Sequence, residues 1–416
     1  MFKTFRYIIH VRQIFNIQTI ARDETIGFRQ FCNSGFDINK EYLDIIEKNI
    51  LIRKHRNNVP LIRSLLCELH KYPSRDSVKK QIVTEIRKLP NSTHNRLVSY
   101  GEKPREIYQF LSKASKNDEF SIVCKFFNFL RTEHLGHYTG HKSYYLMGDL
   151  AALEQKLIRY TVMFLKKIDF RLVCVPDILP SFIINGCGMQ TEGNRTQVYK
   201  IDTEECLSGT SEMALAGLFS DKIIDEKELP LKVAAVSRCY RAETSGLNEE
   251  KGIYRVHQFN KVEMFAVCSE NASEDMLESF RETEVSLFKQ FNLNFRVLDM
   301  PPTELGASAF QKYDIEAWLP GRQMWGEISS CSNCTDYQAK RLNIRYRTKS
   351  GELKYAHTVN GTAAAIPRLL IALIESNKVE NGAIFLPREF GIALNANLLK
   401  RNKIIPAIKL VKHFKV

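Results

Sequence analysis

The sequence lacks several features that would place it outside the ordinary globular proteins. It has no run of about 20 apolar residues, the length that a membrane-spanning helix needs. It contains no internal repeat and no low-complexity linker. Its ten cysteines, from Cys32 to Cys334, do not follow the spacing of a disulfide framework, which indicates free thiols in a reducing compartment. What remains is a globular chain of 416 residues, long enough for about two or three domains.

Acidic residues are absent from the start of the chain. None precedes Asp23, while Lys3, Arg6 and Arg12 are spaced among apolar residues. This is the pattern of a mitochondrial transit peptide, and we expect one over residues 1–34 with the mature protein in the matrix. A basic N-terminal helix is the alternative. The whole chain carries a formal net charge of +13, which favours an anionic partner such as nucleic acid.

One cysteine pair, Cys331 and Cys334, has C-x-x-C spacing. A zinc site would need a second pair or histidines nearby in the fold, and the sequence contains no second C-x-x-C. We therefore favour an ordinary turn, with metal or redox use of the pair as the alternative.

Beyond residues 1–34, apolar periodicity and charge divide the chain into three further parts. Helical spacing predicts a short α-helical hairpin, Val59–Lys71 and Ser77–Leu89, in an N-terminal domain over residues 35–135. Short β-rich runs and helices then alternate over residues 136–392, which predicts an α+β domain on an antiparallel sheet. Residues 393–416 are basic, with no acid after Glu389, and are expected to form a solvated tail in reach of RNA.

The segment over residues 239–263 is the most informative. Two β-like runs flank a polar loop, Thr244–Lys251, which predicts a long hairpin. Arginines suit phosphate oxygens and a flat ring suits a purine, so a strand face that combines them predicts a nucleotide site. A solvent-exposed, salt-bridged face is the alternative. Strand alternation puts these residues on that face: Arg241, Glu243, Arg255, His257, Phe259, Lys261 and Glu263.

These residues resemble motif 2 of the class II aminoacyl-tRNA synthetases in its seryl form. Further seryl-like stretches follow the family's order over residues 136–392, and the likeness is greatest to mitochondrial members. The resemblance implies a class II antiparallel catalytic domain flanked by helices, which activates serine with ATP and transfers it to tRNA(Ser). The stretches are Phe170–Pro176 (motif 1), Thr210–Glu212, Tyr313–Pro320, Glu327–Ser330 and Thr358–Glu375 (motif 3).

The resemblance also implies a role for each residue at the ATP end of the site. Arg241 would hold the α-phosphate and the serine carboxylate. Glu243 would contact the adenine amino group, and Phe259 would stack on the adenine ring. Arg255 and Arg368 would bind the outer phosphates.

The same resemblance assigns a metal site and an amino-acid pocket. Glu327 and Ser330 would coordinate the Mg²⁺ that bridges the phosphates. Arg241, Arg368 and Glu327 would be the catalytic residues. The serine pocket would be lined, besides Arg241, by Thr210, Glu212, Glu263, Asn360 and Thr362.

Two features leave alternatives open. The predicted hairpin would extend only about 20 Å, shorter than the helical arm with which this family grips tRNA across a dimer. We therefore expect either a homodimer or a heterodimer with a longer-armed paralogue, with no membrane partner and with basic stretches such as Arg53–Arg56 and Lys79–Lys80 contacting phosphates. The alternative function is a catalytically silent paralogue that binds RNA or regulates a partner. Enzymes for threonine, proline or histidine fit the Glu327–Ser330 stretch less well.

Overall fold

The structure is a computed structural model that describes residues 40–72, 74–112, 117–133, 135, 139–193, 196–243, 252–387 and 398–405. The expected transit peptide (1–34) and the polar loop Thr244–Lys251 therefore lie outside the described residues. The same holds for most of the expected basic tail, 393–397 and 406–416.

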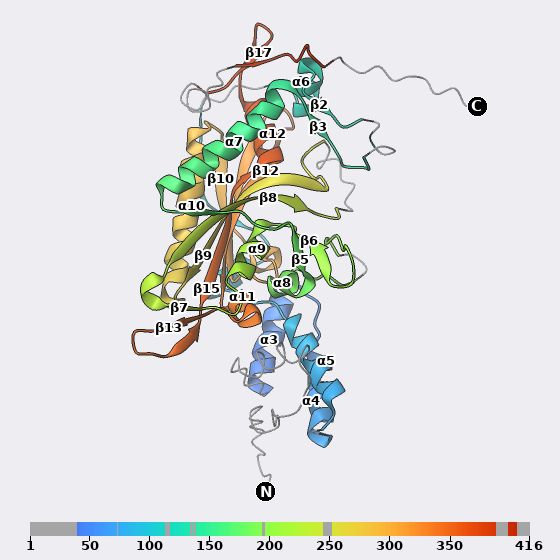
Figure 1. Ribbon diagram of the computed structural model, residues 1–416, viewed down its shortest axis with the longest axis vertical. Coiled ribbons are helices and arrows are strands. Elements are labelled where there is room, and N and C mark those ends of the chain that lie inside the picture. Colours follow the sequence, from blue (N-terminus) through green and yellow to red (C-terminus); the bar gives the residue numbers. More distant parts are fainter. Residues whose placement is uncertain are drawn as a thin grey trace, which may run out of the picture.

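An eight-stranded sheet forms the centre of the molecule (Figure 1). Its strands lie in the order β1-β10-β11-β12-β15-β9-β8-β4. All neighbours pair antiparallel except β4 and β8, which are parallel. The sheet confirms the predicted α+β class. In chain order the strands are β1 Arg105–Phe110, β4 Arg171–Val173, β8 Leu231–Tyr240, β9 Gln258–Cys268, β10 Phe295–Asp299, β11 Gln311–Leu319, β12 Met324–Thr335 and β15 His357–Ala365.

Helices cover the two faces of this sheet unequally. One face buries the larger apolar core under α6 (Phe120–Phe127), α7 (Gly148–Lys167), α10 (Ser273–Gln290) and α12 (Ile366–Ser376). The other face is covered at one end only, by α8 (Ser181–Gly186), α9 (Ser211–Leu218) and α11 (Tyr337–Leu342). The part of that face left without a helix is where the cavity described below lies.

Four smaller sheets and four 3₁₀ turns complete the elements that the described residues form. The smaller strands are β2 Leu130–Arg131, β3 Tyr145–Leu146, β5 Ile178–Pro180, β6 Glu205–Leu207, β7 Ile223–Asp225, β13 Arg345–Arg347, β14 Leu353–Tyr355, β16 Val379–Glu380, β17 Ala383–Phe385 and β18 Leu398–Lys400. The expectation of a solvated tail is wrong for Leu398–Lys400, because β18 pairs with β17 and buries Leu399. The 3₁₀ turns that the structure bounds include η1 Asn95–Tyr100, η2 Glu226–Glu228, η4 Glu270–Ala272 and η5 Pro302–Glu304.

The N-terminal helices form a separate small core below the main sheet (Figure 1). The unit contains α3 (Lys40–Ile52), α4 (Val59–Lys71) and α5 (Asp76–Arg87). The sequence predicts the α4–α5 hairpin within two residues at each end, but α3 is an additional helix. Lys54 adopts a left-handed φ of 54°, and this break separates α3 from α4.

The N-terminal unit is shorter than predicted, because it ends before β1 and does not reach residue 135. β1 pairs with β10 as the edge strand of the main sheet. Phe120 and Phe127 of α6 are fully buried in the main core. Residues from β1 onward therefore belong structurally with the large domain, because their apolar side chains find their partners there.

The predicted motif 2 hairpin is present, but its strands end earlier than expected. β8 and β9 pair from Leu231 opposite Val267 to Tyr240 opposite Gln258. Arg241 therefore follows the first strand, and Arg255 precedes the second, so the expectation that all seven residues of the predicted face lie on strands is wrong. One further bond, from the Arg241 amide to the His257 carbonyl at 2.9 Å, keeps the two chains together beyond the ladder.

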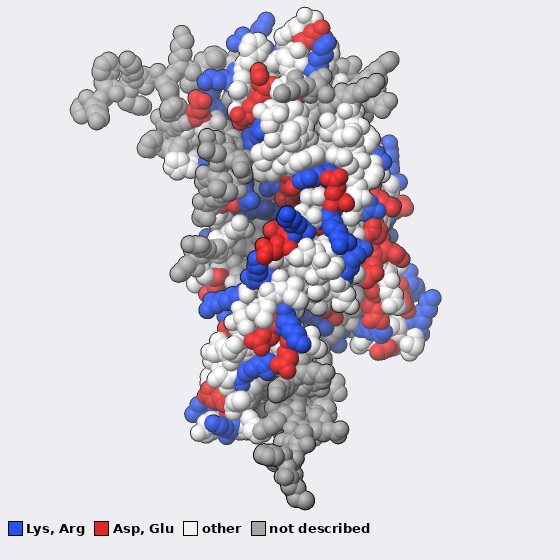
Figure 2. All heavy atoms as spheres, turned by 180° about the vertical axis from the view of Figure 1, so that it is seen from behind, with Lys and Arg blue, Asp and Glu red and all other residues white. Residues whose placement is uncertain are grey.

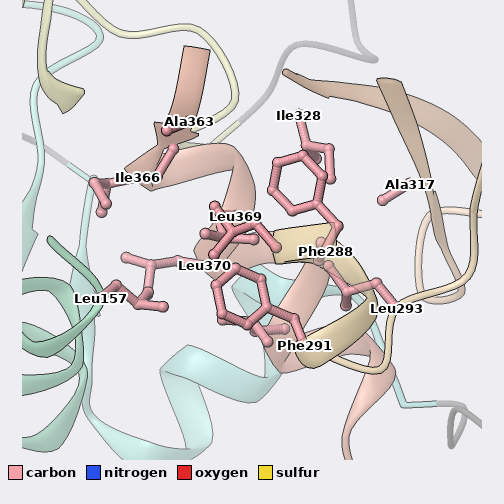
Figure 3. Packing of buried hydrophobic residues seen from close by; sticks show 14 of the residues in the cluster. Leu157, Phe288, Phe291, Leu293, Ala317, Ile328, Ala363, Ile366, Leu369 and Leu370 are labelled. Carbon is pink, nitrogen blue, oxygen red and sulfur yellow. The ribbon is translucent and has the colours of Figure 1, made fainter. Parts of the chain in front are cut away.

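Helix α12 joins the core to the cavity. Pro367 sits in its first turn, where the missing N–H would have had no partner in any case. Figure 3 shows Leu369 and Leu370 among Leu157 of α7 and Phe288 of α10. Arg368, between Pro367 and Leu369 in sequence, lines the cavity instead.

Charge is not concentrated on the face seen in Figure 2. Basic and acidic side chains are interspersed down that face, including the helical unit at its lower end. Among the described helices, none has both the length and the apolar composition needed to cross a membrane.

We expect Leu370→Ala to lower the free energy of unfolding by about 2–5 kcal/mol, because it leaves a cavity in a fully buried site. Leu111→Ala is the matched control, since Leu111 is 70% exposed, and it should change stability by less than about 0.5 kcal/mol. Urea unfolding followed by fluorescence measures both. Equal midpoints for the two variants would contradict this description of the core.

Candidate active site

A cavity of about 750 Å³ opens on the partly covered face of the sheet. Its walls come from β9, β12, β15, the start of α9, the start of α12 and the segments that flank the β8–β9 ladder. The structure brings all twelve predicted site residues together here. They are Thr210, Glu212, Arg241, Glu243, Arg255, Phe259, Glu263, Glu327, Ser330, Asn360, Thr362 and Arg368.

Strand alternation explains why charged residues on β9 reach this cavity. Val262, Met264 and Ala266 are buried in the larger core. Lys261 and Glu263, the residues on either side of Val262 in sequence, line the cavity on the opposite face. Because successive side chains of a strand point to opposite faces, one strand supplies both the apolar core and the polar site.

An arginine and a glutamate pair at one end of the cavity. Nη1 of Arg368 lies 3.1 Å from Oε2 of Glu327 and donates to the Glu327 carbonyl oxygen at 3.0 Å. The Arg368 guanidinium also lies 4.6 Å from the ring centre of Tyr254. Burial alone would raise the pKa of Glu327, but the charges of Arg368 and Lys312 outweigh burial and lower the pKa to about 2. Glu327 is therefore an ionised carboxylate at neutral pH.

Arg241 projects into the cavity just beyond the end of β8. Its guanidinium lies 5.5 Å from the ring centre of Phe259, and its Nε donates to the Gly209 carbonyl at 3.4 Å. His257 supports this position, with Nδ1 lying 3.0 Å from the Arg241 carbonyl and 2.8 Å from the Tyr199 hydroxyl. His257 thus serves the local fold around Arg241.

Glu243 and Arg255 face each other across the open end of the hairpin. Nη1 of Arg255 lies 3.2 Å from Oε2 of Glu243. Glu243 is 8% exposed, so its carboxylate is held within the cavity wall. The two residues meet even though neither lies on a strand.

Glu212 anchors the other half of the cavity. The Thr210 hydroxyl accepts a hydrogen bond from the Glu212 amide and caps α9. Gln338 and Asn360 donate to Oε1 of Glu212 at 2.6 and 2.9 Å. The Thr358 hydroxyl donates to Oε1 of Gln338 at 2.7 Å and so holds that side chain in place. Burial, with the nearby charge of Glu263, raises the pKa of Glu212 to about 7.

Glu263 lies beside Glu212 with two polar partners. Nζ of Lys261 is 2.5 Å from Oε2 of Glu263, and the Thr362 hydroxyl donates to the same oxygen at 3.2 Å. Burial raises the pKa of Glu263, and Lys261 opposes that rise. Two buried carboxylates close to one lysine form a pocket suited to an ammonium group and a hydroxyl.

The sequence interpretation did not assign roles to three residues that the structure places in this network. Lys261 was recognisable from its position two residues before Glu263. Lys312, which lines the cavity and pairs with Asp314 at 2.8 Å, was recognisable only once β11 is known to pair with β12. Gln338 gave no signal, because it reaches Glu212 from a separate helix, α11.

The cysteine pair lies on strand β12, so the expectation of a turn is wrong, and the two thiols lie on opposite sides of the sheet. The Cys334 thiol accepts a hydrogen bond from Asn360 at 3.4 Å, next to the cavity. The Cys331 thiol interacts with Glu284 of α10, under the sheet. Two thiols separated by the sheet cannot bind one ion together. Across the described ranges, no group of three or more histidine, cysteine or acidic side chains is arranged to hold a metal.

Comparison of the sequence with known proteins shows which family this chain is similar to. Residues 198–377 match the model "tRNA synthetase class II core domain (G, H, P, S and T)". The mitochondrial serine–tRNA ligase of Mus musculus is 41% identical over 78% of this chain, and the match spans only 64% of the mouse protein. The serine–tRNA ligase of Dictyoglomus turgidum is 38% identical over 88% of this chain and 93% of its own length.

A solved structure agrees with these matches. Seryl-tRNA synthetase from Pyrococcus horikoshii, crystallised with ATP, superposes with a TM-score of 0.77 at 26% identity, over 88% of this chain and 98% of that one. The match to the bacterial ligase covers nearly the whole of both proteins. Together with the class II sheet and its polar cavity, it shows that this chain belongs to the seryl-tRNA synthetase family of class II aminoacyl-tRNA synthetases.

Proposed function

We propose that this chain is a serine–tRNA ligase, which converts serine and ATP to seryl-adenylate and then transfers the seryl group to tRNA(Ser). One observation carries the proposal: Arg241, Glu327 and Arg368 share a single cavity with Glu212 and Glu263. The cavity thus has a cationic half suited to a nucleotide and an acidic half suited to an amino acid. The family membership shown above supports the same reaction.

The chemistry of activation fits the residues at the centre of the cavity. The serine carboxylate would attack the α-phosphorus of ATP, forming a C–O–P bond as the bond to pyrophosphate breaks. Negative charge builds on the phosphate oxygens, and the fixed guanidinium of Arg241 would stabilise that charge. No general base is required, because the attacking carboxylate is already ionised at neutral pH.

The nucleotide would displace two existing ion pairs. The Glu243–Arg255 and Arg368–Glu327 pairs, at 3.2 and 3.1 Å, hold four charged side chains in place before any ligand binds. In our proposal Glu243 receives the adenine amino group while Arg255 and Arg368 turn to the outer phosphates. Phe259 offers its ring to the adenine. Such preorganisation reduces the ordering cost at the moment of reaction.

Mg²⁺ fits the oxygen donors near Glu327. Mg²⁺ is commonly bound by one or two protein oxygens together with substrate phosphates and waters. The ionised Glu327 carboxylate and the Ser330 hydroxyl on the same strand are hard donors of this kind. We propose that these two residues hold it, where the ion supplies charge neutralisation for the phosphates.

Specificity for serine would come from the acidic half. Glu212, with one oxygen engaged by Gln338 and Asn360, would meet the ammonium group. Glu263 and Thr362 would meet the hydroxyl. A site built to hydrogen-bond a hydroxyl rejects alanine, because buried polar groups would then lack a partner.

The proposal extends to location and partners. The mouse relative is a mitochondrial protein, and we propose the matrix for this chain, with residues 1–34 as transit peptide. We also propose a dimer, homomeric or with a longer-armed paralogue. Apolar side chains that a monomer leaves exposed support it, among them Leu172, Ile178 and Phe182 on β4, β5 and α8. We do not favour a catalytically silent paralogue, because the cavity retains every charged residue that the resemblance predicts for the site.

Arg241→Ala should lower kcat/KM for serine-dependent ATP–pyrophosphate exchange by about 10²–10³-fold, because a fixed charge at the reacting phosphate is lost. Arg347→Ala on β13 removes an exposed arginine far from the cavity lining and should retain activity. If the unaltered chain shows no serine-dependent ATP–pyrophosphate exchange, the proposed function is wrong. An active Arg241→Ala variant would refute only the placement of the phosphate.

The KM for serine should depend on pH through Glu212. Since its pKa is raised to about 7, Glu212 is neutral below that pH and charged above it. The charged form attracts the serine ammonium, so KM should rise as pH falls through about 7. Exchange assays from about pH 6 to 8.5 measure this. Glu212→Gln should show a high and flat KM, whereas a flat KM in the unaltered chain would exclude this role.

A further inference from the structure

One wall of the cavity is a segment of main chain without secondary structure. This wall is residues 305–309, between η5 and β11, of which 306–309 line the cavity directly. Ser308 lies against Gly188, another residue of the cavity lining, where an added Cβ would stand 3.1 Å from the Ser308 amide nitrogen. Gly188 also has a left-handed φ of 92°. This wall therefore has little room to move without changing the shape of the site.

Two residues of the N-terminal part of the chain bind every carbonyl of the wall. Nη2 of Arg53 donates to the carbonyls of Leu305 and Gly306 at 3.4 and 2.6 Å, and Nη1 donates to that of Ala309 at 3.2 Å. The amide of Asn91 donates to the Ala307 carbonyl and its Nδ2 to the Ser308 carbonyl, both at 2.8 Å. Five consecutive carbonyl groups, 305–309, are thus held from outside the cavity.

The Arg53 side chain is buried against these carbonyls and does not face solvent. It follows α3 directly and is 1% exposed, so the sequence-based expectation that it contacts RNA phosphates is wrong. Within the described ranges it forms no ion pair, and its remaining bonds go to the carbonyls of Asn91 and Ser92. A buried guanidinium without a carboxylate is costly. Its two Nη atoms nevertheless reach five carbonyls, whereas a lysine has only three donors, all on one nitrogen.

The wall leads to the amino-acid half of the site. Ser308 is a hydrogen-bond partner of the Cys334 thiol, and that thiol accepts from Asn360. Asn360 in turn donates to Glu212. Asn91 touches the same strand directly, through Nδ2 to the Cys334 carbonyl at 2.8 Å. A shift of the wall would therefore reach Asn360 and Glu212, whereas Glu243 and Phe259 lie in the nucleotide half.

We propose that Arg53 and Asn91 are positioning residues for serine, which fix the 305–309 wall from the N-terminal helical unit and thereby set the affinity of the pocket. The inference rests on the proposed function and assigns a role in that site to a region outside the catalytic sheet. The helical unit then contributes to amino-acid activation itself, in addition to any contact with tRNA.

Full-length Arg53→Lys and Asn91→Ser variants test this inference by ATP–pyrophosphate exchange. We expect KM for serine to rise about tenfold, with KM for ATP within about twofold and kcat within about threefold. Arg63→Met is the matched control and should behave as the unaltered chain. Among the residues that the structure describes, Arg63 on α4 pairs only with Asp44 and Glu47 of the helical unit. Ethylguanidinium added to Arg53→Ala should lower KM for serine again.

Asn91→Ser keeps the backbone bond to Ala307, so it decides the question even if the Arg53 variants do not fold. An unchanged KM for serine in folded Asn91→Ser, or equal rises in KM for serine and for ATP, would overturn the inference while leaving the proposed function intact. A lack of exchange by the unaltered chain would overturn the proposed function and this inference with it.

Discussion

The site depends on the alternation of side chains along β9, β12 and β15. In β9, Met264 is fully buried in the core while its neighbour Glu263 faces the cavity. A slip of one residue in register would exchange the two faces and bury the charges among phenylalanines. The long antiparallel ladders of the central strands, ten residue pairs between β8 and β9, are what hold this register.

The charges in the cavity are already arranged in pairs before substrate binds. Arg368 holds Glu327 and Arg255 holds Glu243, so these side chains are ordered before substrate binds, and the nucleotide replaces both ion pairs with its own contacts. Glu212 is different, because burial and Glu263 raise its pKa to about 7. Glu327, by contrast, has a pKa lowered to about 2 by Arg368 and Lys312 against the effect of burial, and it stays ionised at neutral pH.

Much of this could be predicted from the sequence, because it rests on local patterns. The stretch that resembles motif 3, Thr358–Glu375, covers most of β15 and α12, and the class II fold followed from the order of the motifs. What could not be predicted comes from contacts over long separations. Arg53 looked like a surface cation, because nothing near it in sequence reveals the carbonyls of residues 305–309. The edge strand β1 went unnoticed because its partner, β10, lies almost 200 residues away.

A crystal structure with a non-hydrolysable seryl-adenylate analogue would test the central claim most directly. The account predicts the phosphate substitute against Arg241, the adenine against Phe259, and the serine ammonium and hydroxyl against Glu212 and Glu263, with residues 305–309 unmoved. An analogue bound with its adenine in the acidic half, or outside the cavity, would contradict it.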